Sequence, residues 1–169
     1  MFQKKIAISE KLKVKMENNI LSISMDDKTI QRSFPDTLKL NYQSTHIILK
    51  SDNKSIIGLY HSILKKSVQG LIQNFKKQLV LKGLGYKIAQ EGTMLIFKLG
   101  YSHDEIVSLP KDIKIKILNP TKFILYSHNW EELTLFCSKL KKLRKINPYK
   151  GKGLFFKEET IQLKEGKKK

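Results

Sequence analysis

The sequence predicts an α+β protein of two tandem similar domains, each an antiparallel sheet packed against one helix. Two observations lead to this prediction. The 169-residue chain contains an internal repeat, and each copy changes from an alternating hydrophobic pattern to a three- and four-residue spacing. Alternation is typical of strands and the longer spacing of one apolar helix face. Because 40% of the residues are hydrophobic, the chain has enough apolar surface to form a core.

The repeat appears when the chain is shifted by 76 residues, which places 45–66 on 121–142. Ten of these 22 positions are identical, including Leu49/Leu125 and Lys65/Lys141. The order of strand and helix signals also repeats, so we interpret the chain as two copies of one small domain. The predicted domains are 1–77 and 78–169, with the join near 75–79.

In the first copy, apolar residues alternate with polar ones before the period changes. The strand signals lie at 12–16, 21–25, 38–40 and 47–49, with a turn expected at Asp26-Asp27-Lys28. A helix is predicted over 56–75, where the apolar face consists of Ile56, Leu59, Tyr60, Ile63, Leu64, Val68, Leu71, Ile72 and Phe75. Ser51, Asp52 or Asn53 can cap its start.

The second copy repeats this order. Its strand signals lie at 79–81, 94–99, 113–117 and 123–126, and Ser127 or Asn129 can cap the helix that follows. The apolar face of that helix carries Trp130, Leu133, Phe136, Leu140 and Leu143. Acidic residues at its start and basic residues at its end complement the helix dipole. Pro148 then stops the helix.

The net charge predicts a polyanionic partner. The chain has 33 basic and 15 acidic side chains, a formal net charge of +18, which opposes compaction of the free protein. No apolar run approaches the roughly 20 residues of a membrane span. The first residues lack the pattern of a signal or transit peptide. The single cysteine, Cys137, rules out an intramolecular disulfide and a cysteine-based metal cluster.

The C-terminal 31 residues carry most of the binding signal. Between Lys139 and Lys169 stand twelve Lys or Arg residues against three Glu. The residues that we expect to contact nucleic acid are the helix-end residues Lys141, Lys142, Arg144 and Lys145, the loop Tyr149, Lys150, Gly151, Lys152 and Gly153, and the tail Lys164, Lys167, Lys168 and Lys169. Lysines neutralise phosphates, a tyrosine offers a stacking face, and glycines let the backbone approach closely.

No catalytic, cofactor or metal site is predicted. Four histidines are scattered without metal spacing, and Cys137 falls within or beside an apolar helix face, where a small buried side chain is the simpler interpretation. Gly83-Leu84-Gly85 carries Ile88 where a dinucleotide motif needs its third glycine, so these glycines more simply mark a strand kink or bulge. No pair of acids fits general acid–base chemistry. We therefore expect a binding protein and not an enzyme.

Several stretches resemble the L6 family of large-subunit ribosomal proteins. They are 82–87 (Lys-Gly-Leu-Gly-Tyr-Lys), 99–103 (Leu-Gly-Tyr-Ser-His), Leu109-Pro110 and 148–153 (Pro-Tyr-Lys-Gly-Lys-Gly). The resemblance covers most of the chain and is strongest in its second half. It implies a duplicated α+β fold and a structural role. It also adds Lys82, Tyr86, Lys87, Ser102 and His103 to the expected rRNA-binding residues.

The resemblance implies binding to large-subunit rRNA near the base of the factor-binding stalk and the sarcin–ricin loop. Neighbouring large-subunit proteins, and translational GTPases that dock transiently nearby, are the other implied partners. The alternative from a different class is a free two-domain RNA-binding protein, such as an RNA chaperone or regulator.

The compartment is predicted from composition. The chain contains only two alanines, Ala7 and Ala89, while Lys, Ile, Leu and Asn abound, as AT-rich organelle genomes favour. The weaker family match of the first domain favours the mitochondrial matrix and its ribosome. A plastid or the bacterial cytoplasm stays as the alternative.

Overall fold

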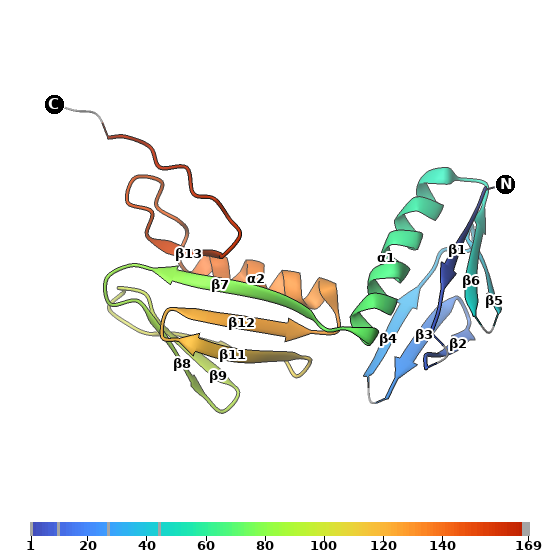
Figure 1. Cartoon of the computed structure of the whole chain (residues 1–169), viewed down its shortest axis with the longest axis horizontal. Helices are drawn as coiled ribbons and strands as arrows, with labels where there is room; N and C mark the ends of the chain where they lie inside the picture. The colour runs from blue at the N-terminus through green and yellow to red at the C-terminus, as the bar shows by residue number, and fades with distance from the viewer. Residues whose placement is uncertain (1, 10, 27, 44, 167–169) are drawn as a thin grey trace. The chain divides into compact units, whose positions relative to one another are not determined.

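The computed structural model describes residues 2–9, 11–26, 28–43 and 45–166 (Figure 1). The chain forms two compact units: an N-terminal unit up to Asn74 that also takes in His128–Trp130, and a C-terminal unit of Phe75–Ser127 and the residues from Glu131 on. Each unit combines antiparallel sheets with one long helix, so the predicted α+β class is confirmed. The functional division at 77/78 stays a prediction.

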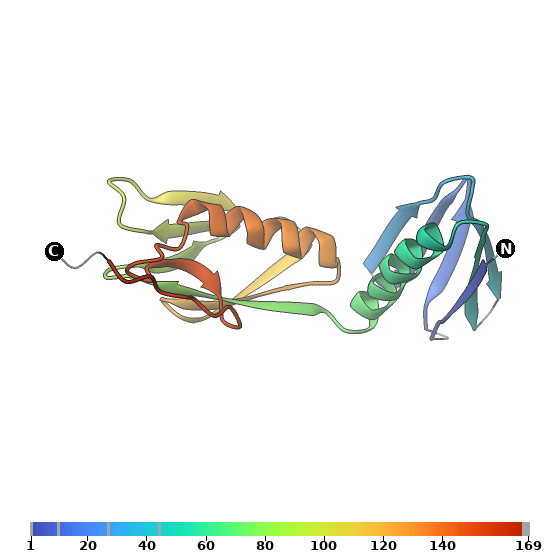
Figure 2. The ribbon, with the colours of Figure 1, turned by 90° about the horizontal axis from the view of Figure 1, so that it is seen from above.

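The N-terminal unit has two three-stranded sheets covered by one helix. Its elements are β1 (Phe2–Ala7), β2 (Lys13–Glu17), β3 (Ile20–Met25), β4 (Lys28–Ser33), β5 (Lys39–Gln43), β6 (His46–Ser51) and α1 (Lys54–Ile72). One sheet has the order β1-β6-β5 and the other is the meander β2-β3-β4. Helix α1 contacts strands of both sheets, as Figures 1 and 2 show. The core thus lies between α1 and the two sheets.

The C-terminal unit repeats this plan with one strand more. Its elements are β7 (Phe75–Lys82), β8 (Lys87–Glu91), β9 (Met94–Lys98), β10 (Glu105–Ser108), β11 (Ile113–Asn119), β12 (Lys122–Ser127), α2 (Trp130–Leu143) and β13 (Gly153–Phe156). The meander is β10-β9-β8, and the second sheet has the order β11-β12-β7-β13. Helix α2 supplies Leu133, Phe136, Cys137 and Leu140 to the core.

Helix α1 begins and ends at residues whose side chains and backbone explain its limits. The Asn53 side chain accepts a hydrogen bond from the Ser55 amide at 2.9 Å, so Asn53 is the cap among the three candidates. The helix ends at Ile72, and Phe75 begins β7. The predicted helix over 56–75 therefore began two residues late and ran three residues past the observed end, because the apolar Phe75 fits the helical spacing but belongs to the next strand.

The largest difference from prediction is the number of strands and sheets. Each unit has two sheets instead of one, and β1, β4, β8, β10 and β13 were not predicted. Most of them are short or rich in charged residues, so they carry little hydrophobic alternation. The expected turn after β3 holds Asp26 at a φ of +52°, while Asp27 lies outside the described residues. Gly83–Gly85 form a turn between β7 and β8, and the expected kink or bulge within a strand was wrong.

Strand β13 fixes the C-terminal segment to the sheet. It pairs antiparallel with β7, with Leu154 opposite Leu81 and Phe156 opposite Leu79. Leu154 is fully buried. Just beyond β13, the Glu159 carboxylate lies 2.6 Å from Lys141 Nζ on α2 and accepts a hydrogen bond from the Phe156 amide. The Lys141 ammonium also lies 4.7 Å from the centre of the Phe156 ring.

Gly153, the first residue of β13, has no room for a side chain. Its φ is +148°, and a Cβ there would lie 2.8 Å from Ile146 Cα and 2.9 Å from the Lys145 carbonyl oxygen. Both neighbours are backbone, so neither can rotate away. We expect Gly153→Ala to destabilise the protein by roughly 2–4 kcal/mol through strain and overlap. Urea denaturation followed by circular dichroism measures this change.

The matched control is Gly58→Ala in the second turn of α1, where a Cβ would meet nothing within 4 Å. Alanine there should raise stability by about 0.5–1 kcal/mol because glycine costs entropy in a helix. A loss of stability in Gly153→Ala no larger than 0.5 kcal/mol would contradict the close packing of the strand start.

The Lys141–Glu159 pair gives stability a pH dependence. The Lys141 ammonium holds the pKa of the Glu159 carboxyl below its ordinary value, so the pair stabilises the fold at pH values where Glu159 is ionised in both states. We expect Glu159→Gln to lower the unfolding free energy by no more than about 1 kcal/mol near neutral pH. This difference should shrink as the pH falls below about 4.5. Glu158→Gln, which removes the adjacent exposed carboxylate, is the control, and the same pH dependence in both variants would contradict the assignment.

Candidate nucleic-acid interface

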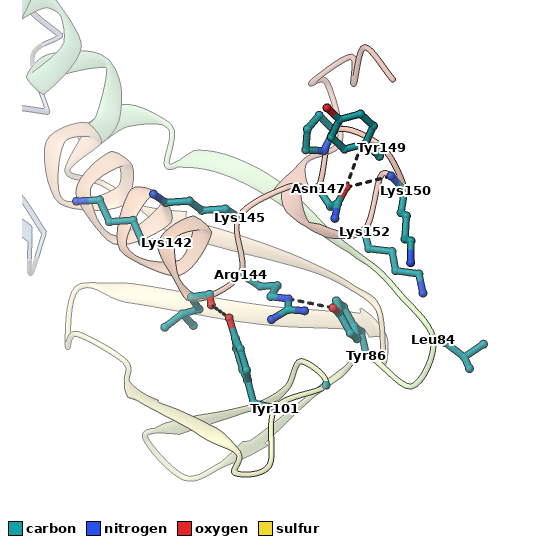
Figure 3. Close-up of a pocket in the computed structure, with 13 residues that line it drawn as sticks. Leu84, Tyr86, Tyr101, Lys142, Arg144, Lys145, Asn147, Tyr149, Lys150 and Lys152 are labelled. Carbon is teal, nitrogen blue, oxygen red and sulfur yellow. Dashed lines mark hydrogen bonds between the residues drawn. The ribbon is translucent and has the colours of Figure 1, made fainter. Parts of the chain in front are cut away.

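The end of α2, the loop that follows it and the turn between β7 and β8 enclose one open cavity of about 780 Å³ (Figure 3). We call it the basic pocket. Its lining residues are Leu84, Tyr86, Gly100, Tyr101, Lys142, Leu143, Arg144, Lys145, Asn147, Pro148, Tyr149, Lys150 and Lys152. Five of these carry positive charge and none is acidic, so the cavity suits an anion.

Asn147 shapes the loop of the basic pocket. Its side-chain oxygen accepts hydrogen bonds from the amides of Tyr149 at 2.9 Å and Lys150 at 3.2 Å. Its backbone carbonyl accepts from the Gly151 amide, and its amide donates to the Lys152 carbonyl, both at 2.8 Å. These four bonds close the loop without using any lysine side chain. Figure 3 shows the side chains of Lys150 and Lys152 extending from it in the same direction.

Arg144 joins the end of α2 to the opposite wall. Its Nε donates to the Tyr86 hydroxyl at 3.2 Å, and its guanidinium lies 4.5 Å from the centre of the Tyr101 ring. The Tyr101 hydroxyl in turn donates to the Leu143 carbonyl at 3.0 Å (Figure 3). Interactions with the hydroxyls of Tyr101 and Tyr86 raise the pKa of Arg144 above its ordinary value. As an arginine it is charged at any ordinary pH, and two tyrosines fix its position.

Tyr86 supports the pocket from within. It is 7% exposed, and its ring lies so close to Gly83 that a Cβ there would be 2.6 Å from the ring carbons. Gly83 thus makes room for an aromatic ring, whereas Gly85 has a φ of +73° and no atom within 4 Å of the position of a Cβ. The buried ring of Tyr86 offers no free stacking face, whereas Tyr149 is 59% exposed.

Most of the sequence-predicted residues gather around the basic pocket. Lys142, Arg144, Lys145, Tyr149, Lys150 and Lys152 line it together with Tyr86. Gly151 lies in the loop and Gly153 begins β13, and neither is among the lining residues. Two further lysines lie close to the loop: the Lys164 amide donates to the Pro148 carbonyl at 2.9 Å, and Lys82 Nζ lies 3.7 Å from the position of a Cβ on Gly151.

Other predicted residues lie apart from the lining. Lys141 contacts Glu159 and Phe156, which gives it a structural role at β13. Lys87 is exposed on β8, and Ser102 and His103 are exposed beyond Tyr101. The His103 ring stacks on Tyr101 at 6.2 Å and its Nε2 lies 3.3 Å from a Glu105 oxygen. Lys167, Lys168 and Lys169 lie outside the described residues.

Six lining residues of the basic pocket were not among the predicted binding residues: Leu84, Gly100, Tyr101, Leu143, Asn147 and Pro148. Asn147 has a recognisable signal, because Asn before Pro is a common turn start. Leu84 is 92% exposed, and an apolar side chain between two glycines is the only sequence signal for it. Tyr101 was part of a family motif, but its contact with Arg144 is long-range and leaves no local pattern.

The structure offers little for catalysis in the residues it describes. Burial raises the pKa of the Cys137 thiol to about 11, so the thiol is protonated at neutral pH, as expected for a buried side chain and not for a nucleophile. Within the described ranges, no three His, Cys, Asp or Glu residues are placed to hold a metal ion. No helix in the described part of the chain is long and apolar enough to cross a membrane.

Comparison with known proteins identifies the family. The family model of ribosomal protein L6 matches residues 82–155, which include the whole lining of the basic pocket. The large ribosomal subunit protein uL6 of Metamycoplasma arthritidis is 31% identical over 159 residues, covering 91% of this chain and 89% of the relative. That of Mycoplasma capricolum subsp. capricolum is 33% identical over 156 residues, covering 89% and 87%. The uL6c protein of Thalassiosira pseudonana is 33% identical over 148 residues, covering 82% and 79%. The chain belongs to the L6 family of ribosomal proteins, as its sequence motifs predicted.

Proposed function

We propose that this chain binds large-subunit rRNA through the basic pocket and the lysines around it. The observation that carries the proposal is the loop 147–152, which its own backbone and Asn147 hold closed while its lysine side chains stay exposed. A loop that is already ordered loses little entropy on binding, so its charges act at full effect on a phosphate backbone. Family membership makes the chain a structural, non-enzymatic component of the large ribosomal subunit.

The finer placement rests on the family motifs. We propose that the pocket contacts rRNA near the base of the factor-binding stalk and the sarcin–ricin loop, where translational GTPases dock. The support is the 148–153 segment, which carries the family signature and supplies four of the lining residues, Pro148, Tyr149, Lys150 and Lys152. Contacts of lysines and backbone amides read the shape of an RNA and not its base sequence. Neighbouring large-subunit proteins complete the proposed set of partners.

The compartment is proposed from composition. We place the chain in the mitochondrial ribosome, with a plastid or bacterial ribosome as the alternative. Sequencing the large-subunit rRNA that co-purifies with the chain tests this, because a mitochondrial rRNA supports the proposal and a plastid or bacterial rRNA overturns it.

Sedimentation tests the ribosomal role itself. We expect one copy of the chain per large subunit on a sucrose gradient after a high-salt wash, quantified by mass spectrometry. Recovery at the top of the gradient, while other large-subunit proteins stay assembled, would favour a free RNA-binding protein. This outcome would be compatible with RNA binding at the basic pocket but would overturn the structural role in the large subunit.

Charge reversal in the loop tests the interface. We expect Lys150→Glu/Lys152→Glu to weaken binding to transcribed large-subunit rRNA and to flatten the salt dependence. The slope of log K against log salt is negative, and each lost phosphate contact should reduce its magnitude by about 0.7–0.9. Filter binding at several salt concentrations measures both quantities.

The matched control is Lys114→Glu/Lys116→Glu, which changes the net charge by the same amount. Both residues are exposed on β11, the edge of the sheet opposite β13. Equal losses in the two double variants would show a general charge effect and reject the loop as the site.

A further inference from the structure

The two units differ at one sheet edge. Strand register makes the units comparable: Leu49 of β6 faces Lys4 of β1, and its repeat counterpart Leu125 of β12 faces Lys77 of β7. Strand β1 is therefore the counterpart of β7. In the C-terminal unit, β13 pairs with the outer edge of β7, while β1 is the edge of its own sheet among the described residues.

The connectivity explains why the N-terminal unit lacks this strand. After α2, the chain loops back through 144–152 and forms β13 on the same sheet. After α1, the chain turns at Gln73 and Asn74 and continues as β7 of the other unit. The chain that follows the helix thus covers the sheet edge in the C-terminal unit as β13. In the N-terminal unit, the chain that follows the helix becomes β7 and cannot cover the edge of β1.

A groove occupies the corresponding place in the N-terminal unit. It has a volume of about 420 Å³ and runs between β1 and α1, lined by Lys5, Ile6, Ala7, His61, Lys65, Val68, Gln69, Ile72 and Gln73. Ile72 is 56% exposed in this groove although it is a large apolar side chain. The C-terminal counterparts of Lys65 and Val68 are Lys141 and Arg144, which contact the β13 segment.

The charge around the groove indicates what would fill it. Its lining includes two lysines and a histidine and no acidic residue. Lys65 is exposed, whereas its counterpart Lys141 lies 2.6 Å from the Glu159 carboxylate and 4.7 Å from the Phe156 ring centre. The matching occupant is an extended segment that offers an aromatic or aliphatic side chain followed by a carboxylate.

The backbone of β1 is oriented to accept such a segment. The Ile8 amide donates to the Thr45 carbonyl, as the Leu81 amide donates to Thr121 in the other unit. Since amides alternate along a strand, those of Lys5 and Ala7 point away from β6. Gln78 is the counterpart of Lys5 in the C-terminal unit. Its carbonyl accepts a hydrogen bond from the Lys157 amide, just beyond β13, at 3.0 Å.

We propose that an extended segment of a neighbouring protein docks in this groove as a fourth strand, antiparallel to β1. Its apolar side chain packs on Val68 and Ile72, and its carboxylate pairs with Lys65. Strand addition of this kind obtains affinity from main-chain hydrogen bonds and specificity from alternate side chains. The proposal concerns the N-terminal unit and does not depend on RNA binding at the basic pocket.

A peptide with the sequence of residues 152–160 is the probe, because the same residues fill the edge position in the C-terminal unit. We expect the labelled peptide to bind the full chain saturably by fluorescence anisotropy, and to perturb the amide NMR signals of β1 and of 61–73. Perturbation confined to Leu79 and Leu81 would mean exchange with β13 and would overturn the proposal.

Ala7→Pro tests the strand pairing. Proline there removes an outward amide of an edge strand and leaves the ladder with β6 intact. We expect about ten-fold weaker peptide binding from the lost hydrogen bond and the ring's bulk. Gln3→Pro, which removes an outward amide outside the groove lining, is the control and should change binding less than about two-fold. Equal effects of both variants would overturn the proposal.

A charge exchange tests the carboxylate. We expect Lys65→Glu to weaken binding of the peptide, and a peptide carrying Lys in place of Glu159 to recover the loss. Recovery cannot arise from a misfolded variant. Failure of the exchanged pair to bind better than either single change would reject the pairing with Lys65.

Two other occupants of the groove, a second copy of this chain and rRNA, can be distinguished from a segment of a neighbouring protein. A concentration-dependent dimer in light scattering that Ala7→Pro abolishes would show that a second copy fills the groove. In assembled large subunits, a photo-crosslinking residue at Gln69 should join the chain to another protein. A crosslink to rRNA alone would overturn the proposal in favour of RNA.

Discussion

The pairing of β13 with β7 is the contact on which the candidate interface depends. Four residues of β13 hold the whole segment from Arg144 to Lys164 against the sheet, with Leu154 fully buried in the core of the unit. The Leu154 amide also donates to the Arg144 carbonyl at 3.2 Å, so the start of the loop is tied to its end. Without this strand the loop that Asn147 closes would not be held at a fixed position relative to Arg144 and the rest of the pocket.

The structural contacts and the exposed charges are carried by different groups. Backbone amides, the Asn147 side chain and the tyrosine hydroxyls make the bonds that close the pocket, while the lysines of the loop remain exposed. Arg144 is the exception, because it is fixed by Tyr86 and Tyr101. Its planar guanidinium suits stacking on an aromatic ring as a lysine ammonium does not. A protein with a net charge of +18 can thus keep the lysines of this loop exposed and still hold the loop that carries them in place.

The sequence predicted the elements with strong periodicity and missed those without it. Both helices and the apolar strands β3, β6, β9 and β12 follow from hydrophobic spacing, and the family motifs pointed to the residues of the pocket. Strand β1 has one buried residue, Ile6, within its bounds, and β13 has four residues after a glycine loop, so neither shows an alternating pattern. The contact of Arg144 with Tyr86 joins residues 58 positions apart, which no local pattern can reveal.

The duplicated fold has an outer sheet edge at β7 and another at β1. The chain covers the edge of β7 with its own strand β13 and, among the described residues, leaves the edge of β1 uncovered. An exposed strand edge invites pairing with other chains, and lysines on the edge are a common protection because they repel a second copy. Strand β1 carries Lys4 and Lys5 at this edge, both exposed. The same charges that oppose self-association attract a segment with a carboxylate, as Glu159 already demonstrates beside Lys141. The lysines of this edge therefore disfavour pairing with a second copy of this chain. Together with the exposed apolar Ile72, they favour a partner strand that carries a carboxylate and an apolar side chain.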